Sequence, residues 1–396
     1  MKTIEQVSLK GKRVLIRVDF NLPLDESLII TDDSRMVASL PTIKKVVSDG
    51  GMAIIMSHLG RPKGVFEKRF SLKNIVPRLS SLLDAPVCFS NDCVGKSVVD
   101  DVRKMKNGDI LVLENLRFHN EEVGGDEVFA KRLASLGDIY VNDAFGVTHR
   151  PHASTAIVPR FFPRKKYFGF LLAKEIFSLK KALNHTKRPF TAIIGGAKIS
   201  GKIDAITSLF NKVDNLIIGG GMAYTFAKAL GGNIGKSLVE NEKVLLAKNL
   251  INLAKKKNVV LLLPSDSLNA RTLKGCVKTN TSNILSIKKD YMGLDIGKDS
   301  IAKFVTIIAN SQTIIWNGPM GVFETEGFEL GTKEIAKAIC LATANGSFSL
   351  VGGGDSVAAL KKFNLEKGVS YLSTGGGAML EYLEGKKLPG IAALMD

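Results

Sequence analysis

Residues 53–62 read AIIMSHLGRP, and the chemistry of this stretch changes halfway along it. Residues 53–56 form a short apolar run of the kind that a buried strand of a parallel sheet presents on both faces. The run stops at residues that are polar or favour turns: Ser57, His58, Gly60, Arg61 and Pro62. Gly60 allows a tight backbone turn and Pro62 stiffens the exit. We interpret the end of this strand as one side of a crevice that holds an anion.

Similar apolar runs rich in valine and isoleucine recur along the whole chain. They cover residues 14–20, 53–58, 110–115, 138–145, 190–196, 215–221, 259–264, 313–319 and 348–354. Most neighbouring runs are separated by enough residues for a crossover helix. This alternation predicts an α/β fold with mainly parallel sheets and helices on both faces. Ligands of such sheets bind at the carboxyl ends of the strands.

The length of the chain predicts two domains, because 396 residues exceed what one hydrophobic core usually serves. Residues 168–190 form a long helical pattern between two series of strands, with an apolar stripe of Leu172, Ile176, Leu179 and Leu183. We expect an N-terminal domain over residues 1–170, an interdomain helix over 171–184 and a C-terminal domain over 185–384.

Composition places the chain among ordinary globular proteins, with 45% hydrophobic and 23% charged residues. Residues 1–14 lack the apolar core of a secretory signal, and no apolar run reaches the roughly 18 residues of a membrane span. We therefore expect a cytoplasmic protein with no membrane partner. Cys88, Cys93, Cys276 and Cys340 form no C-x-x-C pair and have no histidine cluster beside them in the sequence. We interpret them as reduced structural thiols rather than zinc ligands or disulfides.

The net charge of +17 leaves two classes of protein open, a nucleic-acid binder and an enzyme for anionic substrates. The lysines are spread in pairs along the chain and form no single basic block, which is typical of solvated helix faces. A field of this sign would still attract polyanions weakly and steer phosphorylated metabolites.

Arginines mark the strand ends in the first half of the chain. Arg35, Arg61, Arg117 and Arg150 each follow or flank the end of an expected strand. A single arginine in such a place more often caps a carbonyl or lies in solvent. Several around one sheet edge indicate a small-anion site, because the guanidinium fork matches phosphate and carboxylate groups.

The same strand ends carry further polar groups that suit a small oxygen-rich ligand. His58 and His149 offer additional donors. Asp19 and Asn21, in RVDFN, alternate onto one face of the strand or its end, where they could read hydroxyl groups.

Glycines mark the strand ends in the second half, which indicates a phosphate site of another kind. Glycine runs let backbone N–H groups approach phosphate, and the N-terminus of a following helix adds positive potential. In VGGGDSVAAL, residues 351–360, we expect Val351 to end a strand and a helix to start at Ser356. Asp355 is then a candidate ligand for the magnesium ion of a nucleotide, the alternative being a simple helix N-cap.

Two further segments of the second half are candidates for the same site. Lys198 and Lys202 stand at i and i+4, so on a helix they would share one face and could neutralise a transferring phosphoryl group. The alternative is a solvated basic face. Glu324, in WNGPMGVFE, could accept from a ribose hydroxyl, or it is an ordinary loop acid. Residues 231–237, GGNIGKS, lack the first glycine of a P-loop, and no G-x-G-x-x-G occurs.

Taken together, these motifs make the chain resemble the phosphoglycerate kinase family along essentially its whole length. The motifs are RVDFNLPL (17–24), SHLGRP (57–62), ENLRF (114–118), NDAFGVTHRPHAST (142–155), GGAKIS (195–200), GGGMAYTF (219–226), WNGPMGVFE (316–324), GGGDS (352–356) and STGGGAMLE (373–381). The resemblance implies two Rossmann-like domains joined by a helix, with residues 385–396 returning to the first domain. It also implies reversible glycolytic transfer between ATP plus 3-phosphoglycerate and ADP plus 1,3-bisphosphoglycerate, with Mg²⁺.

The resemblance also distributes the candidate residues between two sites. It assigns to the phosphoglycerate site Asp19, Asn21, Arg35, His58, Arg61, Arg117 and Arg150. It assigns to the nucleotide site Lys198, Lys202, Gly219, Gly220, Asn317, Glu324, Gly352, Gly353, Gly354, Asp355 and Ser356. We expect a monomer with no specific nucleic-acid partner.

The expected mechanism is direct in-line transfer after hinge closure, without a covalent intermediate or a general base, because the attacking oxygen is already anionic. Arg35, Lys198 and Lys202 are expected to bear the charge of the transferring group and Asp355 to hold Mg²⁺. Gly201 departs from the family's pattern, and in the first turn of a helix it would cost up to about 1 kcal/mol, which bears on the position of Lys202. The alternatives are a basic nucleic-acid or surface-binding protein without turnover, and a two-domain kinase for another carboxylate.

Overall fold

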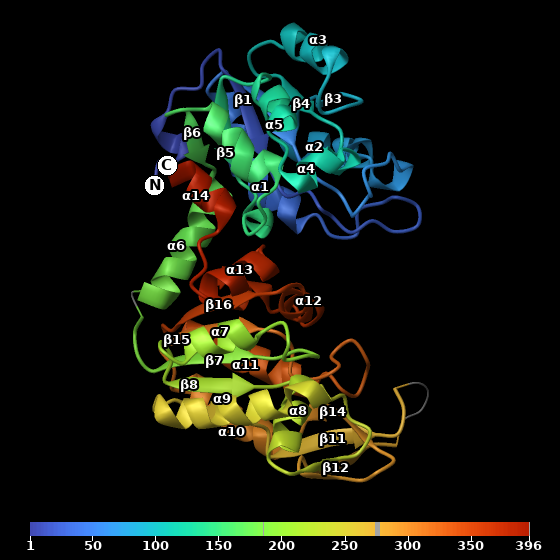
Figure 1. The fold of residues 1–396 in the computed structure, drawn as a ribbon, viewed down its shortest axis with the longest axis vertical. Coiled ribbons are helices and arrows are strands. Elements are labelled where there is room, and N and C mark those ends of the chain that lie inside the picture. Colours follow the sequence, from blue (N-terminus) through green and yellow to red (C-terminus); the bar gives the residue numbers. More distant parts are fainter. Residues whose placement is uncertain (185, 274–277, 396) are drawn as a thin grey trace. The chain divides into compact units, whose positions relative to one another are not determined.

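The computed structural model describes residues 1–184, 186–273 and 278–395, so Cys276 lies outside the described residues. The chain divides into two compact units (Figure 1). The first unit consists of Met1–Phe177 with Lys387–Asp396, and the second of Ser178–Lys386. The boundary falls within helix α6, Phe170–Asn184.

The first unit is built on a six-stranded parallel sheet with the strand order β3-β4-β2-β1-β5-β6. The strands are β1 Arg13–Arg17, β2 Met52–Met56, β3 Cys88–Phe89, β4 Ile110–Val112, β5 Ile139–Asn142 and β6 Lys166–Phe168. The helices of this unit that precede α6 are α1 Ser34–Ser48, α2 Val76–Leu83, α3 Lys96–Lys104, α4 Asn120–Gly124 and α5 Glu127–Ala134. Strand β1 lies between β2 and β5, so side chains that leave its carboxyl end meet those of both neighbours.

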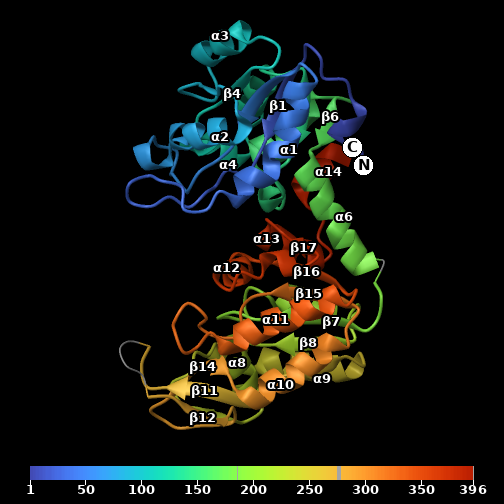
Figure 2. The same cartoon turned by 180° about the vertical axis from the view of Figure 1, so that it is seen from behind.

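The second unit has its own six-stranded parallel sheet, with the order β10-β8-β7-β15-β16-β17. The strands are β7 Phe190–Ile194, β8 Asn215–Ile218, β10 Val260–Leu262, β15 Thr313–Asn317, β16 Phe348–Gly352 and β17 Tyr371–Leu372. The helices are α7 Ile203–Leu209, α8 Met222–Ala229, α9 Val244–Lys256, α10 Lys298–Ala309, α11 Leu330–Ala344, α12 Gly354–Lys362 and α13 Gly376–Leu383. Helices α7 and α11 lie on opposite faces of this sheet, as the view from behind shows (Figure 2).

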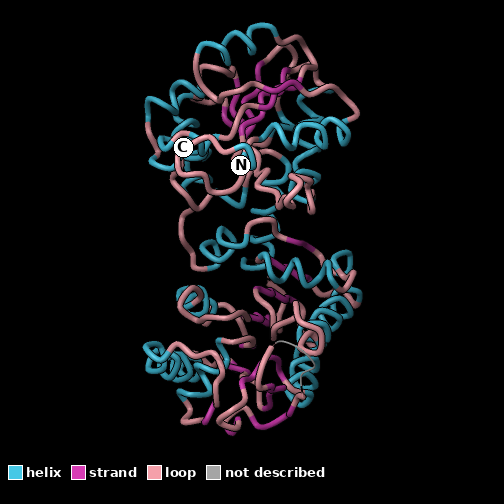
Figure 3. The backbone as a smooth tube through the Cα atoms, turned by 90° about the vertical axis from the view of Figure 1, so that its right-hand side faces the viewer, coloured by secondary structure: helices cyan, strands magenta, loops and turns pink. Residues whose placement is uncertain are grey.

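The predicted α/β class, with mainly parallel sheets in two domains, is confirmed by these two sheets. In each unit the strands lie inside a surround of helices and loops (Figure 3). The parallel sheets could be predicted from the continuous apolar runs, because strands covered on both faces bury every side chain. Strand β7 is an example, with all five of its residues buried.

A small antiparallel sheet in the second unit was absent from our prediction. It has the order β12-β11-β14, with β11 Asp266–Ala270, β12 Asn280–Asn283 and β14 Met292–Ile296. Beside it, β9 Asn233–Ile234 pairs with β13 Ser286–Ile287. The sequence of β12 is NTSN, which lacks the apolar or alternating pattern that marks a strand, and this explains the omission.

The C-terminal tail packs on the first unit through helix α14, Pro389–Met395. The amide of Gly390 donates to the carbonyl of Thr148 at 2.9 Å, and the side-chain amide of Asn142 donates to the carbonyl of Gly390 at 3.5 Å. A side chain at position 390 would lie 3.0 Å from Thr148, so a glycine permits this close approach. Within the described residues, no helix combines the length and the apolar character needed to cross a membrane.

Candidate functional site

The carboxyl end of β1 carries a fully buried arginine that our prediction did not single out. Arg17 is the last residue of β1, and its Nε donates to the hydroxyl of Ser154 at 2.8 Å. Ser154 is held in turn by Glu122, which accepts from its hydroxyl at 2.6 Å and from its amide at 2.9 Å. Arg17, Ser154 and Glu122 therefore form a buried chain behind the sheet edge. A charged residue ending an otherwise apolar strand was the signal available in the sequence.

His58 follows β2 and is neutral. Its Nδ1 lies 3.2 Å from a guanidinium nitrogen of Arg17, and because a guanidinium group only donates, Nδ1 must accept. Burial, and then the positive charges of Arg17 and Arg117, lower the pKa of His58 well below 6.5. His58 can thus donate through its other ring nitrogen without carrying a proton that titrates near neutral pH.

The loop after β1 joins Arg35 to the two polar residues predicted beside it. A guanidinium nitrogen of Arg35 lies 3.3 Å from the carboxylate of Asp19 and donates to the carbonyl of Asn21 at 3.2 Å. The side-chain oxygen of Asn21 accepts from the amide of Gly60 at 2.8 Å. Gly60 has a φ of +64°, and a side chain there would lie 2.3 Å from the ring of Phe70, so only glycine fits this turn.

Arg117 and Arg150 add to the positive charge at this edge. Arg117 follows β4 in the 3-10 turn Leu116–Phe118, is buried, and donates to the carbonyl of Gly60 at 2.7 Å. Burial, and then the charges of Arg17 and Arg150, lower the pKa of Arg117 to about 10. Nε of Arg150 donates to His149 at 3.2 Å. The positive charges of these arginines repel one another, and a bound anion would stabilise them by offsetting this repulsion.

His152 is a second neutral histidine of this cluster and was also missed. Burial, and then the charges of Arg17, Arg117 and Arg150, lower its pKa to about 3. Arg61 differs from the other predicted residues of this group, because it is exposed and has no hydrogen-bond or ion-pair partner among the described residues. The structure thus brings most of the predicted residues into one cationic cluster and leaves Arg61 on its surface.

In the second unit, Lys202 does not share a helix face with Lys198, and that prediction was wrong. Helix α7 begins at Ile203, so Lys202 is its N-cap and Lys198 lies in the preceding loop. Nζ of Lys202 folds back to the carbonyl of Gly195 at 2.6 Å and to the side-chain oxygen of Asn317 at 2.9 Å. The conformation of this segment is therefore stabilised by the hydrogen bonds of the Lys202 ammonium group and is not helical. The helix-propensity cost expected for Gly201 does not apply, since Gly201 also precedes the helix.

Burial lowers the pKa of Lys202 to about 8, and the negative charge of Asp355 acts in the opposite direction. Asp355 is exposed in the first turn of α12, which begins at Gly354 and so two residues before the predicted start at Ser356. Asp355 is not the N-cap, because Gly353 occupies that position with a φ of +98°. An ammonium group and a carboxylate thus act on each other beside a helix N-terminus.

Hydrogen bonds from the end of β15 and the residue after it, to β16 and to α12, fix the glycine loops of this site. The hydroxyl of Ser356 accepts from the amide of Gly318 at 2.6 Å, and the side-chain amide of Asn317 donates to the carbonyl of Gly352 at 3.0 Å. A side chain added at Gly354 would meet nothing within 4 Å, so this part of the loop faces open space. Backbone N–H groups at the start of α12 are therefore accessible to an anion.

Gly219 and Gly220 follow β8 directly and are buried. Gly220 has a φ of +67°, and a side chain there would approach the backbone of Gly196 to 2.6 Å. These glycines therefore pack closely against the loops that follow β7 and β15. Glu324 is exposed, and its backbone carbonyl lies 3.3 Å from Nζ of Lys362.

Glu240 positions the lysine-bearing loop, and sequence reasoning missed it. Its carboxylate accepts from the amides of Ile199 at 2.6 Å and Ser200 at 3.2 Å, in the segment between the two lysines. Its own amide donates to the hydroxyl of Thr225 on α8 at 3.2 Å. A lone acid in residues 237–240, SLVE, gives no local signal for such a role.

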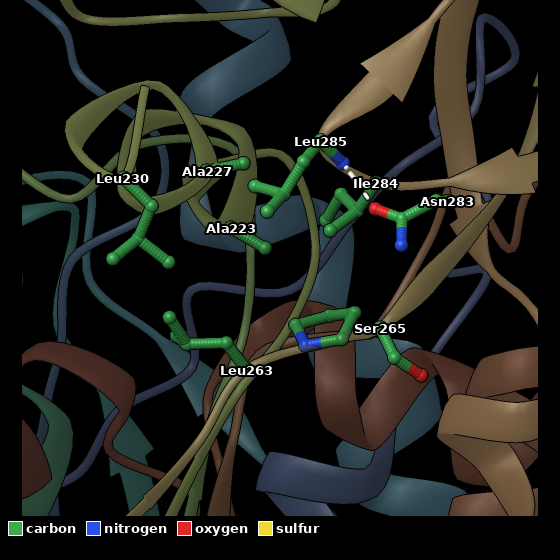
Figure 4. A pocket seen from close by; sticks show the side chains of 9 residues that line it. Ala223, Ala227, Leu230, Leu263, Ser265, Asn283, Ile284 and Leu285 are labelled. Carbon is green, nitrogen blue, oxygen red and sulfur yellow. Dashed lines mark hydrogen bonds between the residues drawn. The ribbon is translucent and has the colours of Figure 1, made fainter. Parts of the chain in front are cut away.

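An apolar cavity of about 220 Å³ lies beside α8 (Figure 4). Ala223, Ala227 and Leu230 of this helical segment line it together with Leu263, Pro264, Ser265 and residues 283–285. The side chain of Asn283 turns back to accept from the amide of Leu285 at 2.8 Å. Among the described residues no cationic side chain lines the cavity, so the described lining lacks the chemistry of a phosphate site.

The two parallel sheets define the class of protein by fold, a two-domain α/β protein. The phosphoglycerate kinase family model matches residues 4–386. Phosphoglycerate kinases from Porphyromonas gingivalis and Chlorobaculum tepidum are 50% and 52% identical to the chain, over 99% and 100% of it and 99% of each relative.

Solved structures agree with the sequence relatives. The phosphoglycerate kinase of Coxiella burnetii superposes with a TM-score of 0.88 at 41% identity, over 99% of this chain and 98% of that one. That of Pyrococcus horikoshii gives 0.85 at 31% identity, over 100% and 98%. The chain belongs to the phosphoglycerate kinase family. It is a phosphotransferase, and the reaction of the family is glycolytic phosphoryl transfer between ATP and 3-phosphoglycerate. A basic binding protein without turnover is not favoured.

Proposed function

We propose that the chain transfers the phosphoryl group directly between the carboxylate of 3-phosphoglycerate, held on the first unit, and the nucleotide, held on the second. The observation that carries this division is the contrast between two sheet ends. At the first sheet end, around the end of β1, lie Arg17, Arg117 and Arg150, whose positive charges repel one another. The second presents glycine loops, a lysine and a helix N-terminus.

In the proposed phosphoglycerate site, Arg117, Arg150 and His58 bind the phosphate and the acid chain, and Arg61 adds an exposed donor. Asp19 and Asn21 accept from the substrate hydroxyl. Their hydrogen bonds with Arg35 and Gly60 hold them in place before the substrate arrives. Pre-organised donors of this kind lower the cost of binding.

Arg35 has a distinct proposed role because its guanidinium group is half exposed while it pairs with Asp19. A side chain of this kind can turn one donor toward the transferring phosphoryl group and keep another on the protein. Lys198 and Lys202 approach the same group from the nucleotide side. Together these three cations offset the charge that develops on the phosphoryl oxygens.

In the proposed nucleotide site, Gly352, Gly353 and Gly354 offer backbone N–H groups to the phosphates, and Glu324 accepts from the ribose. Gly219, Gly220, Asn317 and Ser356 hold the loops that surround them. Asp355 fits a magnesium ion bound to the phosphates, since it is an exposed carboxylate beside the helix N-terminus, and Mg²⁺ in such sites takes one or two carboxylates and keeps several waters. When bound, the ion would neutralise phosphate charge.

The chemistry needs no general base. A β-phosphate oxygen of ADP attacks the phosphorus of the acyl phosphate, and the bond from phosphorus to the carboxylate oxygen breaks as the new bond forms. Reacting atoms must come within roughly 3–3.5 Å, so sites on two units require a closed state with both substrates bound. Closure excludes water, which would otherwise hydrolyse the acyl phosphate. We propose that α6 acts as the hinge and that the enzyme works as a cytoplasmic monomer.

A coupled assay with 3-phosphoglycerate, ATP and Mg²⁺ tests the proposal. We expect turnover by the wild-type chain and a loss of about two to three orders of magnitude in Lys198→Ala, as for the loss of one transition-state donor. Lys228→Ala, which removes an exposed lysine of α8, is the control. Near wild-type turnover in Lys198→Ala would remove this residue from the mechanism.

A further inference from the structure

Three different metal-ligating groups that belong to neither proposed substrate site meet on the first unit. Asp92 and Cys93 lie between β3 and α3, and His119 follows the 3-10 turn Leu116–Phe118. One ligand atom from each residue, an oxygen, a sulfur and a nitrogen, lies within 4.8 Å of the other two. The sequence separates Asp92 from His119 by 27 positions, so our interpretation of Cys93 as a structural thiol could not include this neighbour.

We propose that Asp92, Cys93 and His119 bind one Zn²⁺ ion, with solvent as the fourth ligand. Zinc takes thiolate, imidazole and carboxylate ligands in tetrahedral sites, with Zn–S about 2.3 Å and Zn–N about 2.0 Å. The spacing of the three groups allows such bonds after small shifts of the side chains. Mg²⁺ and Ca²⁺ are excluded by the thiol, because they require oxygen ligands. The site is therefore distinct in chemistry from the proposed magnesium ligand Asp355.

Hydrogen bonds already hold the ligands in place. The Oδ1 atom of Asp92 accepts from the amide of Cys93 at 2.6 Å and lies 2.7 Å from Nε2 of His119. The ring of His119 packs against Phe129 with a centroid distance of 5.3 Å. Zinc would enter between the carboxylate and the imidazole and replace their direct contact. Little side-chain ordering then remains to oppose binding.

The surroundings of Cys93 favour a cation. Its thiol is buried, and the negative charges of Asp92, Glu122 and Glu114 act on it. The same three carboxylates attract a divalent ion, and a thiol that coordinates zinc releases its proton to solvent. The side chains of Asp92 and His119 are 44% and 27% exposed, so an ion can reach the sulfur past them.

The test uses the reduced, metal-free full-length chain and Co²⁺ as a spectroscopic probe for zinc. We expect one equivalent of Co²⁺ to produce a thiolate-to-cobalt charge-transfer absorption and Zn²⁺ to abolish it by competition. Cys93→Ser should remove the absorption. His119→Gln should weaken binding by at least about tenfold, as judged by competition with a chromophoric chelator. Circular dichroism establishes that the variants are folded, and His119, which is only partly buried, keeps the test valid if Cys93→Ser does not fold.

Cys88→Ser is the matched control, because Cys88 is an exposed free thiol a few residues away. It should leave the absorption and the zinc affinity unchanged. The proposal fails if wild-type protein shows no cobalt–thiolate absorption, if the absorption disappears in Cys88→Ser, or if folded His119→Gln binds zinc as tightly as wild type. In those cases the contact between Asp92 and His119 is an ion pair only. None of these results depends on the assignment of the phosphoglycerate or nucleotide sites.

Discussion

The ammonium nitrogen of Lys202 donates a hydrogen bond of 2.9 Å to the side-chain oxygen of Asn317, which is 115 positions further along the chain. The same nitrogen donates to the carbonyl of Gly195 at 2.6 Å. One lysine thus joins the loops that follow β7 and β15, two neighbouring strands of the second sheet. It also donates to the backbone carbonyl of Asn317 at 3.2 Å, so the protein itself takes up all three donors of the ammonium group.

The pH dependence of catalysis should report the ionisation of Lys202. Burial lowers its pKa to about 8, so the ammonium form that the mechanism needs is lost as the pH rises through that value. We expect kcat/KM for ATP to fall above about pH 8. Lys202→Arg keeps its charge and should be slower but flat over this range. A wild-type profile that stays flat would mean that Lys202 is not the ionising group.

Arg61 and Glu324 should separate the two sites. Loss of one charge-assisted hydrogen bond costs about 1.5–3 kcal/mol, which is roughly a 10- to 100-fold change in affinity. Arg61→Ala should weaken 3-phosphoglycerate binding and leave nucleotide binding unchanged, and Glu324→Ala should do the reverse. Calorimetric titration of each variant with each ligand measures this, with exposed Lys73→Ala as the control. Exchanged effects would overturn the assignment of the two units.

Glu240 should affect catalysis through the loop that it holds. Glu240→Ala removes the acceptor for the amides of Ile199 and Ser200, so the unfolding free energy should fall by about 1–3 kcal/mol. We expect kcat to fall more than the nucleotide affinity, because the lysines lose position rather than charge. Glu240→Gln retains an acceptor and should recover part of both losses. Urea denaturation and steady-state kinetics measure these effects, with the exposed neighbour variant Glu242→Ala as the control. Unchanged kcat in folded Glu240→Ala would make the residue purely structural.

His58 and His152 should remain neutral through the physiological range. Both are buried beside arginines, which lowers the pKa of His58 well below 6.5 and that of His152 to about 3. As the pH falls, both histidines bind protons in the unfolded chain at a higher pH than in the folded protein. The unfolding free energy should therefore decrease as the pH falls below about 6.5. Proton NMR of the histidine rings, assigned with His58→Gln and His152→Gln, should show no titration of the His152 ring between about pH 5 and 8 and a midpoint for His58 well below 6.5. A midpoint near 6.5 for either ring would contradict this.

Hinge closure predicts a change of size with ligands. The radius of gyration from solution scattering should be smaller with both substrates bound than with either alone, because only the pair brings donor and acceptor together. A ternary complex no more compact than the free protein would mean that transfer does not depend on closure. A non-reactive nucleotide analogue keeps both ligands in place during the measurement.

The sequence by itself determined the fold class and the contrast between the two halves. The predicted parallel sheets are confirmed. They could be predicted because a strand covered on both faces is a continuous apolar run, which is visible in the sequence without knowledge of its neighbours. The turn at Gly60 was equally local, because a left-handed φ favours glycine wherever it occurs. The functional roles of the strand-end residues follow from the resemblance and remain predictions.

Only the tertiary structure decided which charges are buried and which groups meet. No sequence pattern placed Arg17 against Ser154, 137 positions away, or His119 beside Cys93. The helical spacing of Lys198 and Lys202 was misleading, because hydrogen bonds to Gly195 and Asn317 stabilise another conformation. A pKa, a ligand set or a loop position depends on desolvation and on partners supplied by other strands. Those partners exist only when the sheets have assembled.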